Sequence, residues 1–224
     1  QINPDCNISV RDIFDKKILI IDDVLTKEAF DKLDEASDNF PRTLFLDNHY
    51  NPNGKTYIDA RTTLEFKQNY TYNNFIIRQI SDNYQVYVSW FNWIVVNYAK
   101  VIKPKPNMIG NIPHEDITDY ASILYFDNCE GNGTGFYTTK TGISMVHNEG
   151  LSVLSTNNGY VPNTNDYFFT KDDFEMFYES TEFVSARKNR MILYSGKLLH
   201  GAVHNELMFN DDYRKTMVTF HNVI

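Results

Sequence analysis

The sequence predicts a mainly β protein with flanking helices, folded as an antiparallel sandwich or barrel. Short runs of β-prone residues recur from residue 90 onward, and stretches rich in turn residues separate them. The two longer helical patterns both occur in the first third of the chain, so the chain lacks the strand–helix alternation that is typical of parallel sheets. Aromatic residues make up 15% of the chain, with 15 Tyr and 16 Phe, and such side chains favour sheets.

The first third of the chain predicts one strand and two helices. Ile18–Val24 is an apolar run closed by two Asp, which indicates a buried strand. Thr26 is a candidate N-cap for a helix over Lys27–Phe40, and spaced apolar residues predict a second helix over Asn73–Asp82. Between them, Asp47–Lys55 is dense in turn residues and predicts a surface loop.

The remainder of the chain predicts strands joined by turns. Alternating residues begin at Tyr84 and lead into Trp90–Tyr98, which is almost wholly apolar and β-prone. Further strands are expected at Ser122–Phe126, Gly135–Thr138, Met191–Tyr194 and Lys215–Val223. Asn128–Thr134 and Asn157–Asp166 predict turns, and a short helix is expected near Lys171–Tyr178.

Size and charge narrow the class of protein. The 224 residues suit one domain, with helices and supporting strands in residues 1–100 and the core sheets in residues 101–224. The net charge of −8 and the lack of a dense Lys/Arg cluster argue against nucleic-acid binding, which depends on neutralising phosphates. No apolar run approaches the roughly 18–20 residues that span a bilayer, so we expect no membrane partner.

Cysteine usage favours a reducing compartment. Cys6 and Cys129 are the chain's two cysteines, too few for a disulfide scaffold, so we expect a cytoplasmic protein. The glycosylation sequons at Asn7, Asn69 and Asn132 are interpreted as chance matches. Whether a segment was removed before Gln1 stays open, because the chain does not begin with Met, and the sequence does not indicate an oligomeric state.

The strongest local signal for chemistry is Ile112–Asp116, with the sequence IPHED. In an extended segment, residues i and i+2 point to the same side, so His114 and Asp116 can aim an imidazole nitrogen and a carboxylate oxygen at one point. Such a pair on its own is more often a surface pair than a metal site. A metal site needs at least one more ligand from elsewhere in the chain.

The second half of the signal lies near the C-terminus. Arg190–His200 predicts a strand, a turn and then a histidine. One His and one carboxylate close together, plus a distant His, are the parts of a facial triad that holds Fe(II) and leaves positions open for a co-substrate and O₂. Arg214 follows closely enough for an adjacent antiparallel strand to carry it to the same cavity, where its planar guanidinium suits the far carboxylate of 2-oxoglutarate. Thr216 shares the face of Arg214.

Plain structural interpretations exist for each of these residues. His200 alone fits an ordinary histidine at a strand end, and Arg214 alone fits a surface pair with a neighbouring Asp. The remaining histidines are weaker ligand candidates. His204 is in an expected loop, His147 in a polar stretch without a strand pattern and His49 in the turn-rich loop, while His221 has the wrong parity relative to Arg214.

These residues resemble the prolyl-4-hydroxylase-like branch of the 2-oxoglutarate/Fe(II)-dependent oxygenases, and more closely a bacterial and viral group of that superfamily. The resemblance covers roughly the chain from Met108 onward, about half of it. The shared segments are IPHED, ASILYFD, GTGFYTTKTG, KNRMILYSGKLLHGA and RKTMVTFHN.

The resemblance implies a double-stranded β-helix, a jelly-roll of the cupin type. It implies His114, Asp116 and His200 as iron ligands and Arg214 as the anchor of the 2-oxoglutarate carboxylate. Tyr125 stands where members of the branch often place a hydroxyl on that carboxylate, although core packing explains it equally well. Arg190 and Asn189 match a family feature for which a structural salt bridge and a substrate contact are equally good explanations.

The expected function is hydroxylation of a C–H bond of a small-molecule or peptidyl substrate. Fe(II) is the bound cofactor, 2-oxoglutarate and O₂ are the co-substrates, and succinate and CO₂ are released. The substrate stays open because the long stretch 140–182 departs from the family pattern, and loops on such scaffolds usually determine substrates. Two alternatives remain: a cupin-type metal enzyme that does not use 2-oxoglutarate, and a non-catalytic jelly-roll binding module.

Overall fold

The structure is a computed structural model of the chain. It describes residues 1–38, 43–45, 57–64, 70–85, 88–101, 108–111, 113–140, 143–148, 151–156, 168–170, 175–203 and 214–223.

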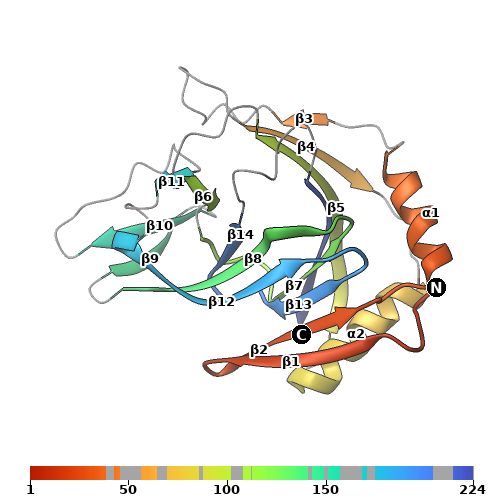
Figure 1. Ribbon diagram of the computed structural model, residues 1–224. Coiled ribbons are helices and arrows are strands. Elements are labelled where there is room, and N and C mark those ends of the chain that lie inside the picture. Colours follow the sequence, from red (N-terminus) through yellow and green to blue (C-terminus); the bar gives the residue numbers. More distant parts are fainter. Residues whose placement is uncertain are drawn as a thin grey trace.

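Two antiparallel sheets form the body of the protein (Figure 1). The larger sheet has eight strands, in the spatial order β1 (Asn7–Ile13), β2 (Lys16–Asp22), β13 (Met191–Ser195), β7 (Tyr120–Tyr125), β15 (Arg214–Val223), β5 (Val88–Val101), β4 (Tyr57–Leu64) and β3 (Thr43–Phe45). The smaller sheet has five, in the order β11 (Phe168–Thr170), β6 (Met108–Asn111), β14 (His200–Val203), β8 (Cys129–Thr139) and β12 (Tyr178–Ala186). A separate hairpin joins β9 (Ile143–Asn148) to β10 (Leu151–Thr156).

The two sheets face each other across a shared core. Residues of both sheets meet in it, among them Tyr125 and Ile192 from the large sheet and Phe136 and Val184 from the small one. The predicted fold, mainly β with flanking helices in a double-stranded β-helix, is therefore confirmed. Strands from the first hundred residues pair directly with strands of the C-terminal half, so both parts of the chain build the same sheet.

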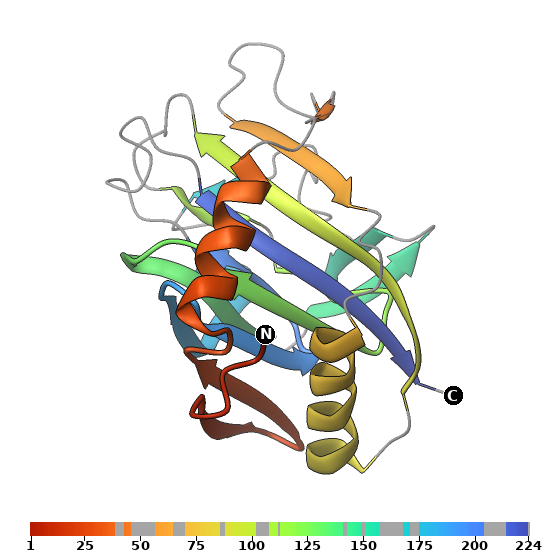
Figure 2. The ribbon, with the colours of Figure 1, turned by 90° about the vertical axis from the view of Figure 1, so that its right-hand side faces the viewer.

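Two helices cover the outer face of the large sheet. α1 (Lys27–Asp38) and α2 (Tyr70–Tyr84) lie on the same side of it (Figure 2). Their apolar residues and the outward residues of the sheet form a second core, of which Leu19, Ile21, Phe30, Ile76, Ile80, Leu124, Met191, Leu193 and Met217 are members. The predicted N-cap is confirmed, because the Thr26 hydroxyl accepts a hydrogen bond from the Ala29 amide at 3.4 Å.

The inner face of the large sheet carries a polar row beside an apolar row. In the ladder, Thr216 pairs with Tyr125 on one side and with Asn97 on the other, and Asn97 pairs with Arg61. Residues that pair directly share a face of the sheet, so polar positions follow one line across four strands. The neighbouring line is apolar over five strands and consists of Ile20, Ile192, Ile123, Val218 and Val95.

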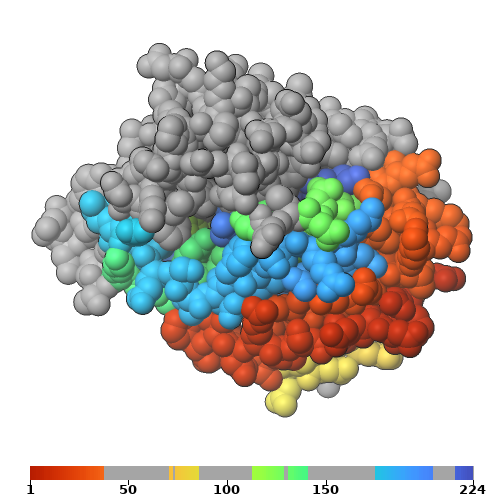
Figure 3. Space-filling model, in the orientation of Figure 1, coloured from red at the N-terminus to blue at the C-terminus, as the bar shows by residue number. Residues whose placement is uncertain are grey.

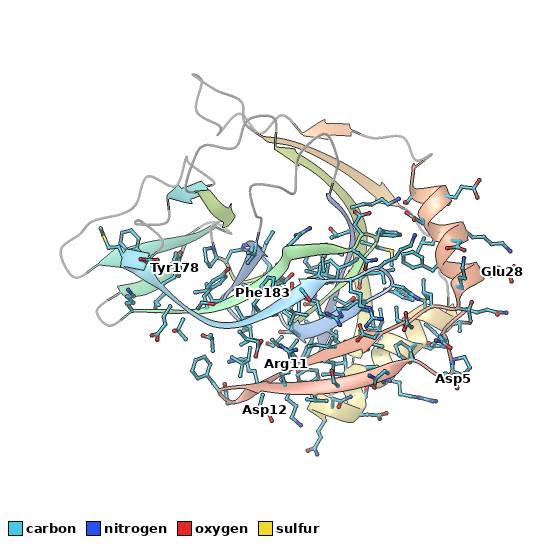
Figure 4. All side chains as sticks on the ribbon, viewed as in Figure 1. Asp5, Arg11, Asp12, Glu28, Tyr178 and Phe183 are labelled. Carbon is cyan, nitrogen blue, oxygen red and sulfur yellow. The ribbon has the colours of Figure 1, made fainter. Side chains whose placement is uncertain are left out.

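An ion pair links the edge of the large sheet to the small sheet. The Arg11 guanidinium on β1 donates to the Glu182 carboxylate at 2.6 Å and to the Phe183 carbonyl at 3.3 Å. Figure 3 shows β12 lying along the β1–β2 hairpin, and Figure 4 labels Arg11 and Phe183 on the facing strands. Because Arg11 is half exposed, this contact contributes orientation more than stability.

Several predicted elements differ from the structure. Tyr84 ends α2 instead of starting a strand, since its hydroxyl reaches back to the Lys17 carbonyl at 2.8 Å. The predicted turn at Asn128–Thr134 is wrong over most of its length: β8 starts at Cys129 and absorbs the extra residues in a bulge around Gly131, whose φ is 78°. The sequence did not predict β1.

Other predictions fall partly or wholly on residues that the structure leaves out. The loops Asp47–Lys55 and Asn157–Asp166 lie outside the described residues. Of the short helix expected near Lys171–Tyr178, residues 175–177 are helical and β12 begins directly afterwards. Within the described part of the chain, no helix is long and apolar enough to cross a membrane.

A buried histidine on β15 predicts acid sensitivity of the fold. His221 is fully buried, and burial lowers its pKa from 6.5 to about 3. Its neutral form therefore stabilises the folded state above the unfolded pKa of 6.5, and this contribution is lost as the pH falls below that value. Replacing His221 with Gln should make the loss of unfolding free energy between pH 7 and pH 5 smaller by about 2 kcal/mol.

Urea denaturation of both proteins at the two pH values measures this difference. Equal losses for wild type and His221→Gln would contradict a neutral, buried His221.

Candidate metal centre

A pair of backbone hydrogen bonds brings the candidate ligands together. The His114 amide donates to the His200 carbonyl at 2.8 Å, and the His200 amide donates to the His114 carbonyl at 2.9 Å. Two residues further on, the Asp116 amide donates to the Gly196 carbonyl, also at 2.8 Å. The IPHED segment therefore lies antiparallel to the end of the turn that precedes β14.

The three ligand atoms converge as the sequence predicted. One ligand atom each from His114, Asp116 and His200 lie within 4.8 Å of one another. Asp116 is at the centre, with Oδ2 at 3.4 Å from His200 Nε2 and Oδ1 at 4.0 Å from His114 Nε2. The His200 side chain is 6% exposed and that of His114 is 47% exposed, so the centre opens to solvent on the His114 side.

The surroundings of His200 determine which ring nitrogen is available. His200 Nδ1 lies 2.8 Å from the Leu198 carbonyl, which can only accept, so the hydrogen is on Nδ1 and the lone pair of Nε2 faces Asp116. Burial, and secondarily His114, lower the pKa of His200 to about 3, although the Leu198 carbonyl opposes this. The ring also packs against Tyr194, with 4.7 Å between centroids. His200 is thus a neutral, oriented donor.

Asp116 faces the lone pair of His200 Nε2 without a compensating hydrogen bond among the described residues. Its Oδ2 atom is buried and has no hydrogen-bond partner among the described residues. Desolvation raises the pKa of Asp116, while the nearby His114 and Lys197 act in the opposite direction. A carboxylate lone pair and an imidazole lone pair 3.4 Å apart repel each other unless a cation lies between them. Two imidazoles and one carboxylate fit Fe(II) as a donor set.

The polar row across the large sheet contains the predicted co-substrate contacts. Tyr125 and Thr216 are paired, and both are buried, at 1% and 3% exposed. The backbone of Arg214 lies one same-face position beyond Thr216 and pairs with Ala99. The Tyr125 hydroxyl is 2.6 Å from the hydroxyl of Thr134 on the opposite sheet, a residue that the sequence interpretation missed. The available signal was the alternation along the GTGFY strand, because Thr134 lies two residues before the inward-facing Phe136 and shares its face.

One expectation about Arg214 is wrong. We expected an adjacent antiparallel strand to carry it from His200 to the cavity, but β14 and β15 belong to opposing sheets. β14 lies in the small sheet and β15 in the large sheet, so the backbone of Arg214 lies on the wall that faces His200. That Arg214, Tyr125 and Thr216 bind 2-oxoglutarate stays a prediction, as does the binding of iron.

The neighbouring family feature is structural. Arg190 binds Asp22 through two hydrogen bonds of 2.6 and 3.0 Å and also donates to Ser185, which ties β13 to β2 and β12. Arg190 lowers the pKa of Asp22 through this hydrogen bond. Asn189, with φ at 62°, exchanges two side-chain hydrogen bonds with the backbone of Leu25. Both residues lie in the scaffold and not in the metal centre.

Among the competing histidines, His221 is the one whose side chain the structure describes, and it lies outside the metal centre. His221 has the parity of the outer face, as predicted, and lies 3.1 Å from the Thr219 hydroxyl. His147 is on β9, so the expectation that its stretch lacks strand structure is wrong. His49 and His204 lie outside the described residues.

Comparisons with known proteins give a family and a fold. The model of a family described as "Family of unknown function (DUF6445)" matches residues 4–222, so the chain belongs to this family. No curated protein matches the sequence.

Solved structures with a similar fold include the following three. The epimerase SnoN, in complex with Fe3+, alpha ketoglutarate and nogalamycin RO, has a TM-score of 0.52 and 12% identity, over 92% of this chain and 78% of SnoN. A Pseudomonas putida prolyl-4-hydroxylase has a TM-score of 0.48 and 8% identity, over 92% and 91% of the two chains. An oxidoreductase of the 2OG-Fe(II) oxygenase family from Burkholderia pseudomallei has a TM-score of 0.46 and 10% identity, over 92% of this chain and 84% of that chain. At these identities the similarity to SnoN concerns the fold alone.

The buried carboxylate predicts a conflict between metal binding and stability. Without metal, replacing Asp116 with Asn removes an uncompensated charge and supplies an N–H donor to His200 Nε2. The free energy of unfolding of the variant should exceed that of wild type by about 1 kcal/mol at pH 7 in EDTA. Chemical denaturation measures this.

The matched control is Asp119→Asn, because Asp119 Oδ2 already accepts the Val223 amide at 3.0 Å and should gain nothing. A less stable Asp116→Asn protein in EDTA would show that the carboxylate is satisfied without a cation.

Proposed function

We propose that this member of the DUF6445 family is an Fe(II)- and 2-oxoglutarate-dependent oxygenase. It hydroxylates a C–H bond of a small-molecule or peptidyl substrate and releases succinate and CO₂. The observation that carries the proposal is the convergence of His114, Asp116 and His200 around a buried carboxylate oxygen that has no hydrogen-bond partner among the described residues.

The proposed ligands have different tasks. His200 and Asp116 are the inner ligands, because their side chains are almost wholly shielded from water. His114 completes the set from the solvent side. Iron bound there with 2-oxoglutarate and O₂ supplies the oxidation of the C–H bond. The protein orients the ligands and keeps the His200 imidazole neutral, as metal binding requires.

The polar row provides a place for the far carboxylate of 2-oxoglutarate. Tyr125 and Thr134 offer hydroxyls from the two opposing sheets, and Thr216 lies beside Tyr125 on the same wall. Arg214 is the proposed anchor, since a guanidinium grips a carboxylate through two parallel hydrogen bonds. The apolar row that contains Ile123 and Ile192 excludes water beside this polar line.

An anaerobic titration tests the proposal. Fe(II) and 2-oxoglutarate added together should produce the weak visible charge-transfer band of a chelated 2-oxo acid, and His114→Ala and His200→Ala should abolish it. A cupin-type enzyme that does not use 2-oxoglutarate would bind Fe(II) without the band. A non-catalytic binding module would show neither band nor site-dependent iron binding, and either result would reject the proposal.

The anchor assignment has its own test in the same titration. Arg214→Ala should raise the apparent Kd for 2-oxoglutarate by at least about tenfold, because a charge-assisted, two-pronged contact is lost. The control is Arg187→Ala, since Arg187 is half exposed and lies 3.6 Å from Asp22, away from the centre. Unchanged 2-oxoglutarate affinity in Arg214→Ala would reject Arg214 as the anchor.

A further inference from the structure

We propose that the turn Ser195–Leu198, with Lys197 as its decisive residue, is a clamp that positions the carboxylate ligand of the metal centre. Lys197 is a positioning residue that acts through the backbone of Asp116. The proposal rests on the proposed metal site, and it assigns a role to a residue that contributes no ligand atom.

The turn contacts both inner ligands. It is closed by a hydrogen bond from the Leu198 amide to the Ser195 carbonyl at 2.9 Å. The Gly196 carbonyl accepts the Asp116 amide, and the Leu198 carbonyl accepts His200 Nδ1, each at 2.8 Å. One four-residue turn therefore determines where Asp116 lies and which nitrogen His200 presents.

Lys197 holds the ligand segment from the other side. Its ammonium group donates to the Asp116 carbonyl at 3.0 Å and to the Ile117 carbonyl at 3.1 Å. Lys197 is at the surface, where a lysine normally extends into solvent. Ordering its side chain costs rotamer entropy, which the two hydrogen bonds must offset. Because the two carbonyls are successive, these hydrogen bonds fix the peptide that follows Asp116.

The ligand segment needs such a restraint at the residue that follows Asp116. Ile117 is 79% exposed, so the residue after Asp116 contributes almost no hydrophobic anchoring. The segment pairs with the start of β14 through the reciprocal hydrogen bonds of His114 and His200. The hydrogen bond from the Asp116 amide to the Gly196 carbonyl then joins the segment to the turn. The residue after Ile117, Thr118, is buried again.

Gly196 shows how closely the turn approaches the segment. A Cβ atom at Gly196 would lie 2.2 Å from the Thr118 carbonyl oxygen and 3.0 Å from the Asp116 Cβ. The first distance is a backbone clash, so no other residue fits without moving the segment. The Gly196 amide also donates to the Asp119 carbonyl at 2.8 Å. The turn and the ligand segment thus behave as one unit.

The charge of Lys197 supports the same task. Asp116 is desolvated, which disfavours its anionic form, and the ammonium group offsets part of this cost. A positive charge on the backbone side of Asp116 leaves the carboxylate oxygens available for a cation. Removing Lys197 should therefore weaken metal binding through position and charge together.

The experiment compares Lys197→Met and Lys197→Arg with a matched control. Lys140→Met is that control, since Lys140 is also exposed and also donates to a backbone carbonyl, that of Glu175, away from the centre. Co(II) affinity and the visible Co(II) spectrum are measured for each protein. Lys197→Met should bind Co(II) about tenfold to a hundredfold more weakly, as for other groups that orient ligands. Lys197→Arg should recover most of the affinity, and Lys140→Met should match wild type.

A second readout needs no metal. In EDTA, hydrogen exchange of peptides spanning Pro113–Thr118 should be faster in Lys197→Met than in wild type, and unchanged in Lys140→Met. Wild-type exchange in Lys197→Met would overturn the clamp, and so would wild-type Co(II) affinity and spectrum. If wild type itself bound no Co(II), the proposed function would fail, and the exchange result alone would decide whether the clamp exists.

Discussion

The candidate centre depends on the two reciprocal backbone hydrogen bonds between His114 and His200, at 2.8 and 2.9 Å. They join the segment before β7 to the start of β14, which are far apart in the chain, and they place two imidazoles side by side. Their ring centroids are 4.7 Å apart. The next bond in the series, from Asp116 to Gly196, puts the carboxylate between the imidazoles. Every further property of the centre depends on this local pairing.

The pairing places polar groups where the fold alone would not favour them. Asp116 Oδ2 and His200 are buried beside Phe136 and Tyr194, whose rings would pack equally well against apolar residues. Desolvation raises the pKa of Asp116 and lowers that of His200, so burial disfavours the charged form of each side chain. A bound divalent cation reverses the penalty on the carboxylate. The centre is thus a strained polar site on a stable scaffold, which is typical of functional sites.

Much of this arrangement could be predicted from the sequence. The i, i+2 relation of His114 and Asp116 predicted their convergence, and parity along β15 placed Thr216 and Arg214 on one face and His221 on the other. The sheet that each strand joins was not predictable, because pairing between distant strands is not encoded in local periodicity. For this reason Arg214 was expected beside His200 instead of opposite it. Thr134 and Lys197 were missed, since their contacts depend on the approach of the two sheets and of the turn.

The most direct test of the account is the position of a bound metal. Crystals prepared without oxygen with Mn(II), which prefers similar ligands to Fe(II), and 2-oxoglutarate should give an anomalous difference peak. The account predicts that the strongest peak lies within coordination distance of His114, Asp116 and His200, with 2-oxoglutarate extending from it toward Arg214 and Tyr125. A peak bound by other residues, or no peak at a centre whose three side chains are ordered, would contradict it.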